Sequence, residues 1–450
     1  SLYRILRRSG CVRMKYFEPD MERMSREQVE RLQDKELRHV ISRAYQRVKM
    51  YHDRFEQLGL HSHDLDGLKD LEKVPYTTKN DLRSYPLTER LAVPEMNIVR
   101  YFSSSGTTGR PVAFGFTLKD LEVGAVCCAK TFTSATISRE DKVLEPIPSG
   151  LYSVTVAQKG LEKIGAKVIH TGPGRTKELQ IPMLSGEFEK SMRPTAMIAS
   201  ASYAMRIAEV AEEVGKKPRE FGLKKLVCGV DMWSESKRRI LQEAYGAPAF
   251  DVFGLIEASG GPAVAAECEE HQGLHVWENY FLVEVIDPET GERLGEGEEG
   301  ELVITGLQKD AHPIVRYRTG DITKIFSYEK CACGRTNMRI GRIAGRTDDR
   351  VKVRGVQLYP NAVEEALLSI PGVGSEYQVV IREAGGIDEM LVKVEGRRED
   401  PIAPDLSSDI ADYFKGVFNI TPTVEVVPHG KLPRISGTKV KRFLDLRPRS

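Results

Sequence analysis

Apolar positions recur along this chain with two periods, one typical of helices and one of strands. At helical spacing they predict helices over 19–50, 119–136 and 203–214. In the first of these segments, Ser25 and Gln28 form a candidate capping box. Short strand-like runs lie between the helices: "RYF" (100–102), "KLVCGV" (225–230) and "AFDVFG" (249–254). This alternation is typical of an α/β domain with a mainly parallel sheet.

The pattern changes from about residue 281. The stretch "FLVEVIDPETGERLGEGEEGELVITGL" predicts a β-hairpin, because two alternating runs flank a turn rich in Gly, Pro and Glu. After 345–355, the order of predicted elements is a strand, a helix (361–369), strands at 377–381 and 389–395, a helix (406–418) and a strand (423–427). We therefore expect a large domain over residues 1–344 and a small α+β domain over 345–450.

Composition narrows the class of protein. A chain of 450 residues is too long for one ordinary core, and its net charge of +1 gives no basic surface for nucleic acid. No apolar run is long enough to span a membrane, and the first residues, "SLYRILRRSGCVRMKYF", do not resemble a secretion signal. Seven cysteines, an odd number, favour a reducing cytoplasm over a disulfide framework.

The densest polar loop is "SSSGTTGR", residues 103–110. Every position is a glycine or a hydrogen-bond donor, and the loop follows a predicted strand. Consecutive backbone N–H groups, hydroxyls and the Arg110 guanidinium together suit phosphate oxygens. The loop lacks the Gly-Lys-Ser/Thr of a Walker A motif, and the alternative interpretation is a polar surface loop.

Together with Pro111, this loop resembles the phosphate loop of adenylate-forming enzymes, the acyl-CoA synthetase superfamily. Further motifs of that family follow in order: "CGVDMWSE" (228–235), "DVFGLIEASG" (251–260), "IVRYRTGD" (314–321), "GRIAGRTDDRVKVRGVQLYP" (341–360) and "LPRISGTKVKRF" (432–443). The resemblance runs from about residue 20 to the end and is strongest to the phenylacetate–CoA ligase branch. It implies a large ATP-binding domain followed by a small mobile C-terminal domain.

The resemblance assigns roles around the phosphates of ATP. In that family a carboxylate attacks the α-phosphorus and pyrophosphate leaves, so amides, cations and Mg²⁺ must meet the growing negative charge. Glu257 is identified as the Mg²⁺ ligand, a role that suits a carboxylate, although by itself it could be a solvated surface residue. Glu257, Thr107 and Lys439 are the expected catalytic residues. The expected phosphate loop consists of Ser103, Ser104, Ser105, Gly106, Thr107, Thr108, Gly109 and Arg110.

The resemblance also assigns the nucleoside contacts. Asp321 is expected to accept hydrogen bonds from the ribose hydroxyls, although alone it could be a turn aspartate. Arg346 matches the arginine that reaches the ribose and phosphates, and Arg342 lies close enough to compete. Phe253 stands where the family more often has Tyr, so a hydroxyl contact is lost. Asp231 stands where the branch usually has Glu, so its carboxylate reaches less far toward adenine. The expected adenine segment consists of Gly229, Val230, Asp231, Asp251, Phe253 and Gly254.

Lys439 is the candidate for the catalytic lysine, a mobile cation between the α-phosphate and the acyl oxygen. The segment "SGTKVK" is one residue longer than the usual spacing, so Lys441 and Lys431 remain alternatives. The resemblance implies that the small domain rotates about Asp348 after adenylation, bringing CoA to the acyl-adenylate.

Three cysteines and a histidine have the composition of a closed zinc site. Cys268 begins "CEEHQGLHVW", and Cys331 and Cys333 lie in "CACG", which gives a tetrahedral Zn²⁺ set with one histidine. Some members of the branch carry the histidine in a "GLH" triplet, so His275 is preferred over His271. The expected role is structural, and the alternative is a group of reduced thiols near surface histidines.

The resemblance implies an ATP-dependent acid–CoA ligase that forms an acyl-adenylate from phenylacetate or another aryl acid. It also implies a homodimer, whereas the absence of a nucleic-acid or membrane partner is expected from the net charge and the short apolar runs. One alternative is an adenylyl transferase that stops at the AMP adduct, as on a deazaflavin hydroxyl, and another is a catalytically silent nucleotide-binding scaffold. The walls of the acid pocket are expected within 146–155 and 254–262.

Overall fold

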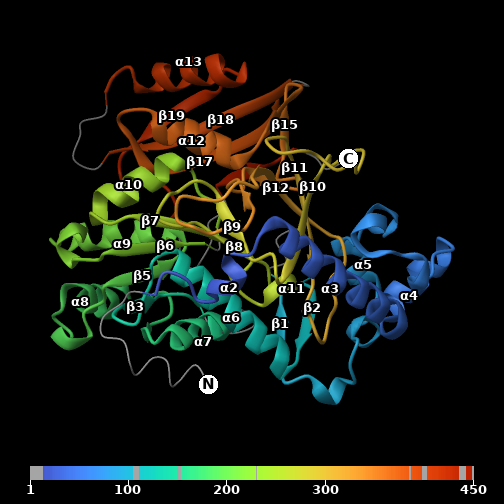
Figure 1. Cartoon of the computed structure of the whole chain (residues 1–450). Helices are drawn as coiled ribbons and strands as arrows, with labels where there is room; N and C mark the ends of the chain where they lie inside the picture. The colour runs from blue at the N-terminus through green and yellow to red at the C-terminus, as the bar shows by residue number, and fades with distance from the viewer. Residues whose placement is uncertain are drawn as a thin grey trace.

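The structure is a computed structural model of the whole chain. It describes residues 14–104, 111–148, 154–229, 231–384, 387–397, 403–434 and 442–447. Figure 1 shows a large body that contains the N-terminal three quarters of the chain, with the C-terminal elements packed across its top. Within the described residues, no helix has the length and apolar character needed to cross a membrane.

The N-terminal helical region is interrupted twice. The structure has α2 (Pro19–Glu22), α3 (Arg26–Arg47) and α4 (Lys49–Gln57) where the apolar period predicts one segment over 19–50. The capping box is confirmed, because the Ser25 side chain accepts from the N–H of Gln28 and the Gln28 side chain accepts from the N–H of Ser25. This cap begins α3, and the extended backbone of Val48 separates α3 from α4.

One half of the large sheet is parallel, in the order β4-β3-β5-β6-β7. Its strands are β3 (Lys142–Glu145), β4 (Lys167–His170), β5 (Ala196–Ala199), β6 (Lys225–Cys228) and β7 (Ala249–Phe253). The helices of this region are α6 (Leu118–Ser134), α7 (Val154–Ile164), α8 (Ile181–Ser185), α9 (Ala201–Glu213) and α10 (Glu235–Tyr245). The predicted helices at 119–136 and 203–214 are therefore confirmed as α6 and α9.

Alternating side chains of the parallel strands enter two different cores. In β5, Ala196 and Ile198 pack into the core that includes α6 and α7, whereas Met197 and Ala199 pack into the core that includes α9 and α10. Strand side chains point alternately to the two faces of a sheet, so both faces of the parallel half are covered by helices.

The other half of the sheet is antiparallel. Its strands are β8 (Ala265–Ala266), β9 (Leu274–Val276), β10 (Phe281–Ile286), β11 (Glu299–Gly306), β12 (Tyr317–Ser327), β13 (Arg339–Ile340) and β14 (Gly345–Arg346). The predicted hairpin at 281–307 is confirmed as β10 and β11. A mainly parallel sheet is thus correct for residues 142–253, and the sheet as a whole is mixed.

Smaller elements complete the large domain. A separate hairpin joins β1 (Arg100–Ser103) to β2 (Ala113–Phe116), and two short helices are α5 (Lys79–Ser84) and α11 (Ile256–Ser259).

The C-terminal domain has its own sheet and core. Its sheet has the order β19-β18-β17-β20, and a two-stranded sheet, β15 with β16, precedes it. The elements are β15 (Val351–Val353), β16 (Val356–Leu358), α12 (Pro360–Ser369), β17 (Val373–Ala384), β18 (Ile387–Gly396), α13 (Leu406–Phe418), β19 (Thr423–Val427) and β20 (Phe443–Asp445). Because β14 still pairs with β12, the change from one core to the other falls between Arg346 and Val351.

Candidate active site

The β1–β2 hairpin holds the two ends of the candidate phosphate loop together. The N–H of Ser104 donates to the carbonyl of Val112 at 2.9 Å, and the N–H of Val112 donates to the Ser104 hydroxyl at 3.1 Å. Ser103 is the last residue of β1 and pairs with Ala113. The rest of the expected loop, residues 105–110, lies outside the described residues.

Glu257 is buried in α11, close to a lysine that the sequence motifs do not contain. Glu257 is 5% exposed, and its carboxylate accepts a hydrogen bond from the Tyr317 hydroxyl at 3.4 Å. Lys79, the first residue of α5, lies within electrostatic reach of Glu257, Arg346 and Asp348, and burial lowers the pKa of its ammonium group. Among the described residues Lys79 has no hydrogen-bond or ion-pair partner. The sequence around Lys79 indicates a helix start at Thr78, but it does not predict that Lys79 lies near Glu257.

Asp321 and Arg346 form the next part of the site, across the pairing of β12 with β14. The Arg346 Nη1 lies 2.6 Å from the Asp321 Oδ1. The other carboxylate oxygen, Oδ2, is buried without a hydrogen-bond partner among the described residues. Burial, only partly offset by Arg346, raises the pKa of Asp321 to about 6. One oxygen of this carboxylate is therefore available to accept a hydrogen bond from a ligand.

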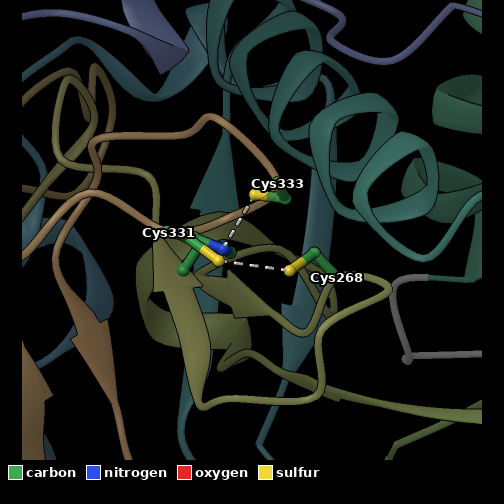
Figure 2. Close-up of side chains that lie close together, drawn as sticks. Cys268, Cys331 and Cys333 are labelled. Carbon is green, nitrogen blue, oxygen red and sulfur yellow. Dashed lines mark hydrogen bonds between the residues drawn. The ribbon is translucent and has the colours of Figure 1, made fainter.

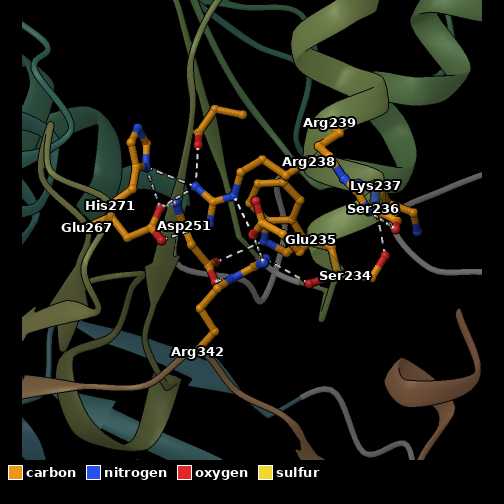
Figure 3. A network of polar contacts seen from close by, with 12 residues as sticks. Ser234, Glu235, Ser236, Lys237, Arg238, Arg239, Asp251, Glu267, His271 and Arg342 are labelled. Carbon is orange, nitrogen blue, oxygen red and sulfur yellow. Dashed lines mark hydrogen bonds and ion pairs between the residues drawn. The ribbon is translucent and has the colours of Figure 1, made fainter. Parts of the chain in front are cut away.

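Arg342, the competing arginine, is engaged elsewhere (Figure 3). Its guanidinium donates to Asp251 Oδ2 at 2.9 Å, to Glu235 at 2.9 Å and to the carbonyl of Trp233 at 2.7 Å. The Trp233 indole N–H donates to the other oxygen of Asp251 at 2.9 Å, and burial raises the pKa of Asp251. Of the two arginines, the structure places Arg346 beside the expected ribose carboxylate and Arg342 beside the expected purine segment.

Arg346 also joins this site to the expected hinge. Its Nε donates to Asp348 Oδ1 at 2.8 Å, while its Nη1 donates to Asp321. A Cβ at Gly320, whose φ is +79°, would lie 2.9 Å from the Arg346 Nη2, so the glycine leaves room for the guanidinium.

The expected adenine segment lies at the carboxyl ends of β6 and β7. Asp231 accepts hydrogen bonds from the backbone N–H groups of Ala201 and Ser202 at 3.1 and 3.2 Å, at the start of α9. A Cβ at Gly254 would lie 2.2 Å from the carbonyl oxygen of Gly261, so only glycine fits there. Gly229 and Phe253 flank this edge, and Val230 lies outside the described residues. The contact of Asp231 with adenine stays a prediction.

Cys268, His275, Cys331 and Cys333 converge on one point. Their ligand atoms all lie within 4.8 Å of one another, and all four residues are buried. Figure 2 shows the three labelled thiols pointing toward one another. His271, the alternative histidine, lies outside this group: its Nδ1 is 3.0 Å from the Arg238 guanidinium and its ring stacks on Phe250.

The spacing of these atoms fits the edges of a tetrahedron. A Zn–S bond of about 2.3 Å and a Zn–N bond of about 2.0 Å place neighbouring ligand atoms about 3.5 to 3.8 Å apart. The sulfurs of Cys268 and Cys331 are 3.8 Å apart, and the Cys333 sulfur is 3.5 Å from the His275 Nε2. The contact with Cys333 raises the pKa of Cys268, so the thiols cannot all ionise unless a cation joins them. The donor set therefore fits Zn²⁺.

Within the residues that the structure describes, none of the candidates for the catalytic lysine lies in this site. Lys439 and Lys441 lie outside them, and Lys431 is exposed. The site as described contains Glu257, Asp321 and Arg346.

Sequence comparisons identify the family of the chain. A sequence profile described as "AMP-binding enzyme" matches residues 24–308, and one described as "AMP-binding enzyme C-terminal domain" matches residues 355–447. Phenylacetate–coenzyme A ligase of Thermus thermophilus is 37% identical over 96% of this chain and 99% of its own length. The enzyme of the same name from Escherichia coli is 33% identical over 95% of this chain and 97% of its own.

A solved acyl-CoA ligase shares the fold and the arrangement of the two domains. 2-Hydroxyisobutyryl-CoA ligase in the postadenylation state, in complex with 2-HIB-AMP, superposes with a TM-score of 0.88 at 28% identity, covering 97% of this chain and 94% of that one. The same enzyme in the thioesterification state gives a TM-score of 0.71, with 98% of this chain and 94% of that one covered. The two structures are of one enzyme and differ in state and in the bound CoA, and the higher TM-score indicates that the domains of this chain are arranged more nearly as in the first structure. The chain belongs to the AMP-binding enzyme family, in its phenylacetate–CoA ligase-like branch.

Proposed function

We propose that this chain is an AMP-forming acid–CoA ligase that works in two half-reactions. In the first, the acid carboxylate attacks the α-phosphorus of ATP, which gives an acyl-adenylate and pyrophosphate. In the second, the CoA thiol attacks the acyl carbon, which gives a thioester, AMP and a proton. The observation that carries the proposal is the buried Asp321 beside Arg346, with one oxygen that no described residue hydrogen-bonds and that could accept from a ribose hydroxyl.

The other residues of the site have matching roles. Glu257 would hold Mg²⁺, which neutralises the phosphates as pyrophosphate leaves. Lys79, within electrostatic reach of Glu257 and Arg346, would add positive charge to the site, and the loop 103–110 would contribute backbone N–H groups. Lys439 would bridge the α-phosphate and the acyl oxygen, and the C-terminal domain would rotate about Asp348 between the half-reactions.

We propose an aryl acid such as phenylacetate as the substrate. The support is the name shared by the relatives that match this chain over nearly its full length. Apolar contacts separate neighbouring acids by only about 1–3 kcal/mol per methylene, so the acid has to be identified by assay.

We also propose that the cysteine–histidine cluster holds a structural Zn²⁺, since four protein ligands leave no position open for chemistry. The enzyme would act as a homodimer in the cytoplasm. The six described cysteines, all free thiols, suit a reducing compartment.

The test is acid-dependent pyrophosphate release with ATP and Mg²⁺ across a panel of aryl acids, each with and without CoA. We expect turnover that requires both an acid and CoA, and a thioester as product. An AMP adduct that accumulates without regard to CoA would instead indicate an adenylyl transferase. Pyrophosphate release that no acid stimulates would contradict the proposal.

A further inference from the structure

A buried ion pair joins the two domains. Lys237, on α10 of the large domain, places its Nζ 2.5 Å from the Oε1 of Glu364, on α12 of the C-terminal domain. Their side chains are 2% and 6% exposed. The Tyr377 hydroxyl also donates to Glu364, at 3.2 Å. Burial alone would raise the pKa of Glu364, but the charge and hydrogen bond of Lys237, together with Arg442 and the Ser234 N–H, hold that pKa below its usual range.

Glu364 and its neighbour also cap α10 from the other domain. The N–H of Ser234, the N-cap residue of α10, donates to Glu364 Oε2 at 3.2 Å. The N–H and the hydroxyl of Ser236 both donate to Glu365, each at 2.7 Å. The first N–H groups of a helix lack partners within the helix and favour negative charge, so these two carboxylates bind the start of α10. Such contacts exist only while α12 faces this helix end.

The same contact connects with the expected adenine segment. Lys237 Nζ lies 3.4 Å from the Ser202 hydroxyl, and the Ser202 N–H donates to Asp231. Glu235, between Ser234 and Ser236 in the sequence, accepts a hydrogen bond from Arg342, whose guanidinium also donates to Asp251 (Figure 3). The end of α10 thus contacts the nucleotide side of the large domain and the C-terminal domain at once.

We infer that Lys237, Glu364 and Glu365 are positioning residues that hold the C-terminal domain in the orientation used for adenylate formation, and that their contact opens before CoA reacts. This inference rests on the proposed function. Its support is geometric: the contact joins the two domains, it is buried, and the domain arrangement matches the postadenylation structure better than the thioesterification structure. Contacts present in one orientation only shift the population toward that orientation.

The test separates the two half-reactions in Glu364→Gln and Lys237→Met. Each variant leaves an unpaired charge in the interface, which water can solvate when the domain swings away. We expect acid-dependent ATP–pyrophosphate exchange to fall at least tenfold, while thioester formation from preformed acyl-adenylate and CoA stays within twofold of the original enzyme. The double variant should lose no more exchange activity than either single variant, because each single variant already removes the same interaction.

Two further variants keep the test sharp if the buried changes impair folding. Glu365 is 40% exposed, so Glu365→Gln should fold normally and show the same split, to a smaller degree. The matched control is Glu389→Gln, which removes an exposed carboxylate paired with Arg382 within the C-terminal domain. It should leave both half-reactions unchanged. Half-reactions that fall together, or that do not change in any interface variant, would overturn the inference.

A measurement without turnover separates this inference from the proposed function. Arg350 is exposed at the end of the segment that joins the domains, and Lys352 and Arg354 are exposed in the β15–β16 hairpin that follows it, so trypsin cleavage over 350–354 reports how firmly the C-terminal domain is docked. We expect faster cleavage in Glu364→Gln and Lys237→Met than in Glu389→Gln, even if no acid in the panel is a substrate. Equal cleavage rates would overturn the inference and leave the ligase proposal standing.

Discussion

At the residue scale, Asp321 is a buried carboxylate with one oxygen bound to Arg346 and the other without a hydrogen-bond partner among the described residues. Its pKa of about 6 means that it is ionised at neutral pH and about half protonated at pH 6. A protonated carboxyl is a poorer acceptor for two ribose hydroxyls and loses its attraction to Arg346. The binding of ATP is therefore expected to weaken as the pH falls.

We predict that the KM for MgATP, measured with a saturating concentration of the acid substrate, rises as the pH is lowered through 6. Well below pH 6 the rise should be roughly tenfold per pH unit. In Asp321→Asn the KM should be high already at pH 7.5 and nearly independent of pH between 5.5 and 7.5. Steady-state kinetics over that range measures both. A KM that stays flat in the original enzyme while Asp321→Asn raises it would show that Asp321 contacts ATP without titrating.

Arg342 and Arg346 show what the sequence leaves open at this scale. They are four positions apart in one motif, and spacing alone cannot tell which faces the ribose. The pairing of β12 with β14 places Arg346 opposite Asp321, while Trp233 and Asp251 hold Arg342. Lys79 is a harder case, because it lies more than 170 residues from Glu257 and belongs to no motif.

At the scale of elements, the cysteine–histidine cluster joins two short segments. His275 lies on β9 and pairs with Arg339 on β13, which follows the turn that carries Cys331 and Cys333. Strands of two or three residues contribute few contacts of their own. A metal with one ligand set on each side would stabilise this corner of the sheet.

We predict that Cys331→Ser lowers bound zinc and the melting temperature together, the latter by roughly 5 °C or more. A strong chelator should have the same effect on the original enzyme. Thermal unfolding and metal analysis of the same preparations measure this. Cys228→Ala is the control: it changes a buried thiol outside the cluster and should leave the zinc content unchanged. Protein purified under metal-replete conditions without zinc would contradict the prediction.

Elements with a clear apolar period were predictable, as α6, α9 and the β10–β11 hairpin show. Strands β8, β9 and β13 were not, because two or three residues are too few to carry a period. Helix α10 was missed because its sequence, "ESKRRILQEAY", is mostly polar. Its buried face includes Lys237 and Arg238, which form ion pairs with Glu364 and Glu267. These partners are distant in the sequence, so the sequence alone does not predict the pairs.

At the scale of the whole molecule, one site has to serve two reactions. A residue that acts on the reacting atoms must therefore be distinguished from a contact that only positions the C-terminal domain. The lysine that acts on the α-phosphate belongs to the first half-reaction only. Loss of that lysine and loss of the docking contact at α10 would both reduce adenylate formation and spare thioester formation. The two differ in domain arrangement, because a lysine side chain that supplies charge to the reacting atoms does not hold the domain.

We predict that Lys439→Ala lowers acid-dependent ATP–pyrophosphate exchange at least a hundredfold, since it removes the cation that meets the developing charge. Thioester formation from preformed acyl-adenylate should stay within a few-fold, and trypsin cleavage at 350–354 should match the original enzyme. In Glu364→Gln the exchange is also reduced, but cleavage is faster. Lys441→Ala and Lys431→Ala are the matched controls and should retain exchange. If Lys441→Ala loses exchange and Lys439→Ala keeps it, the catalytic lysine is two residues further along, and the extra residue in "SGTKVK" has shifted the motif.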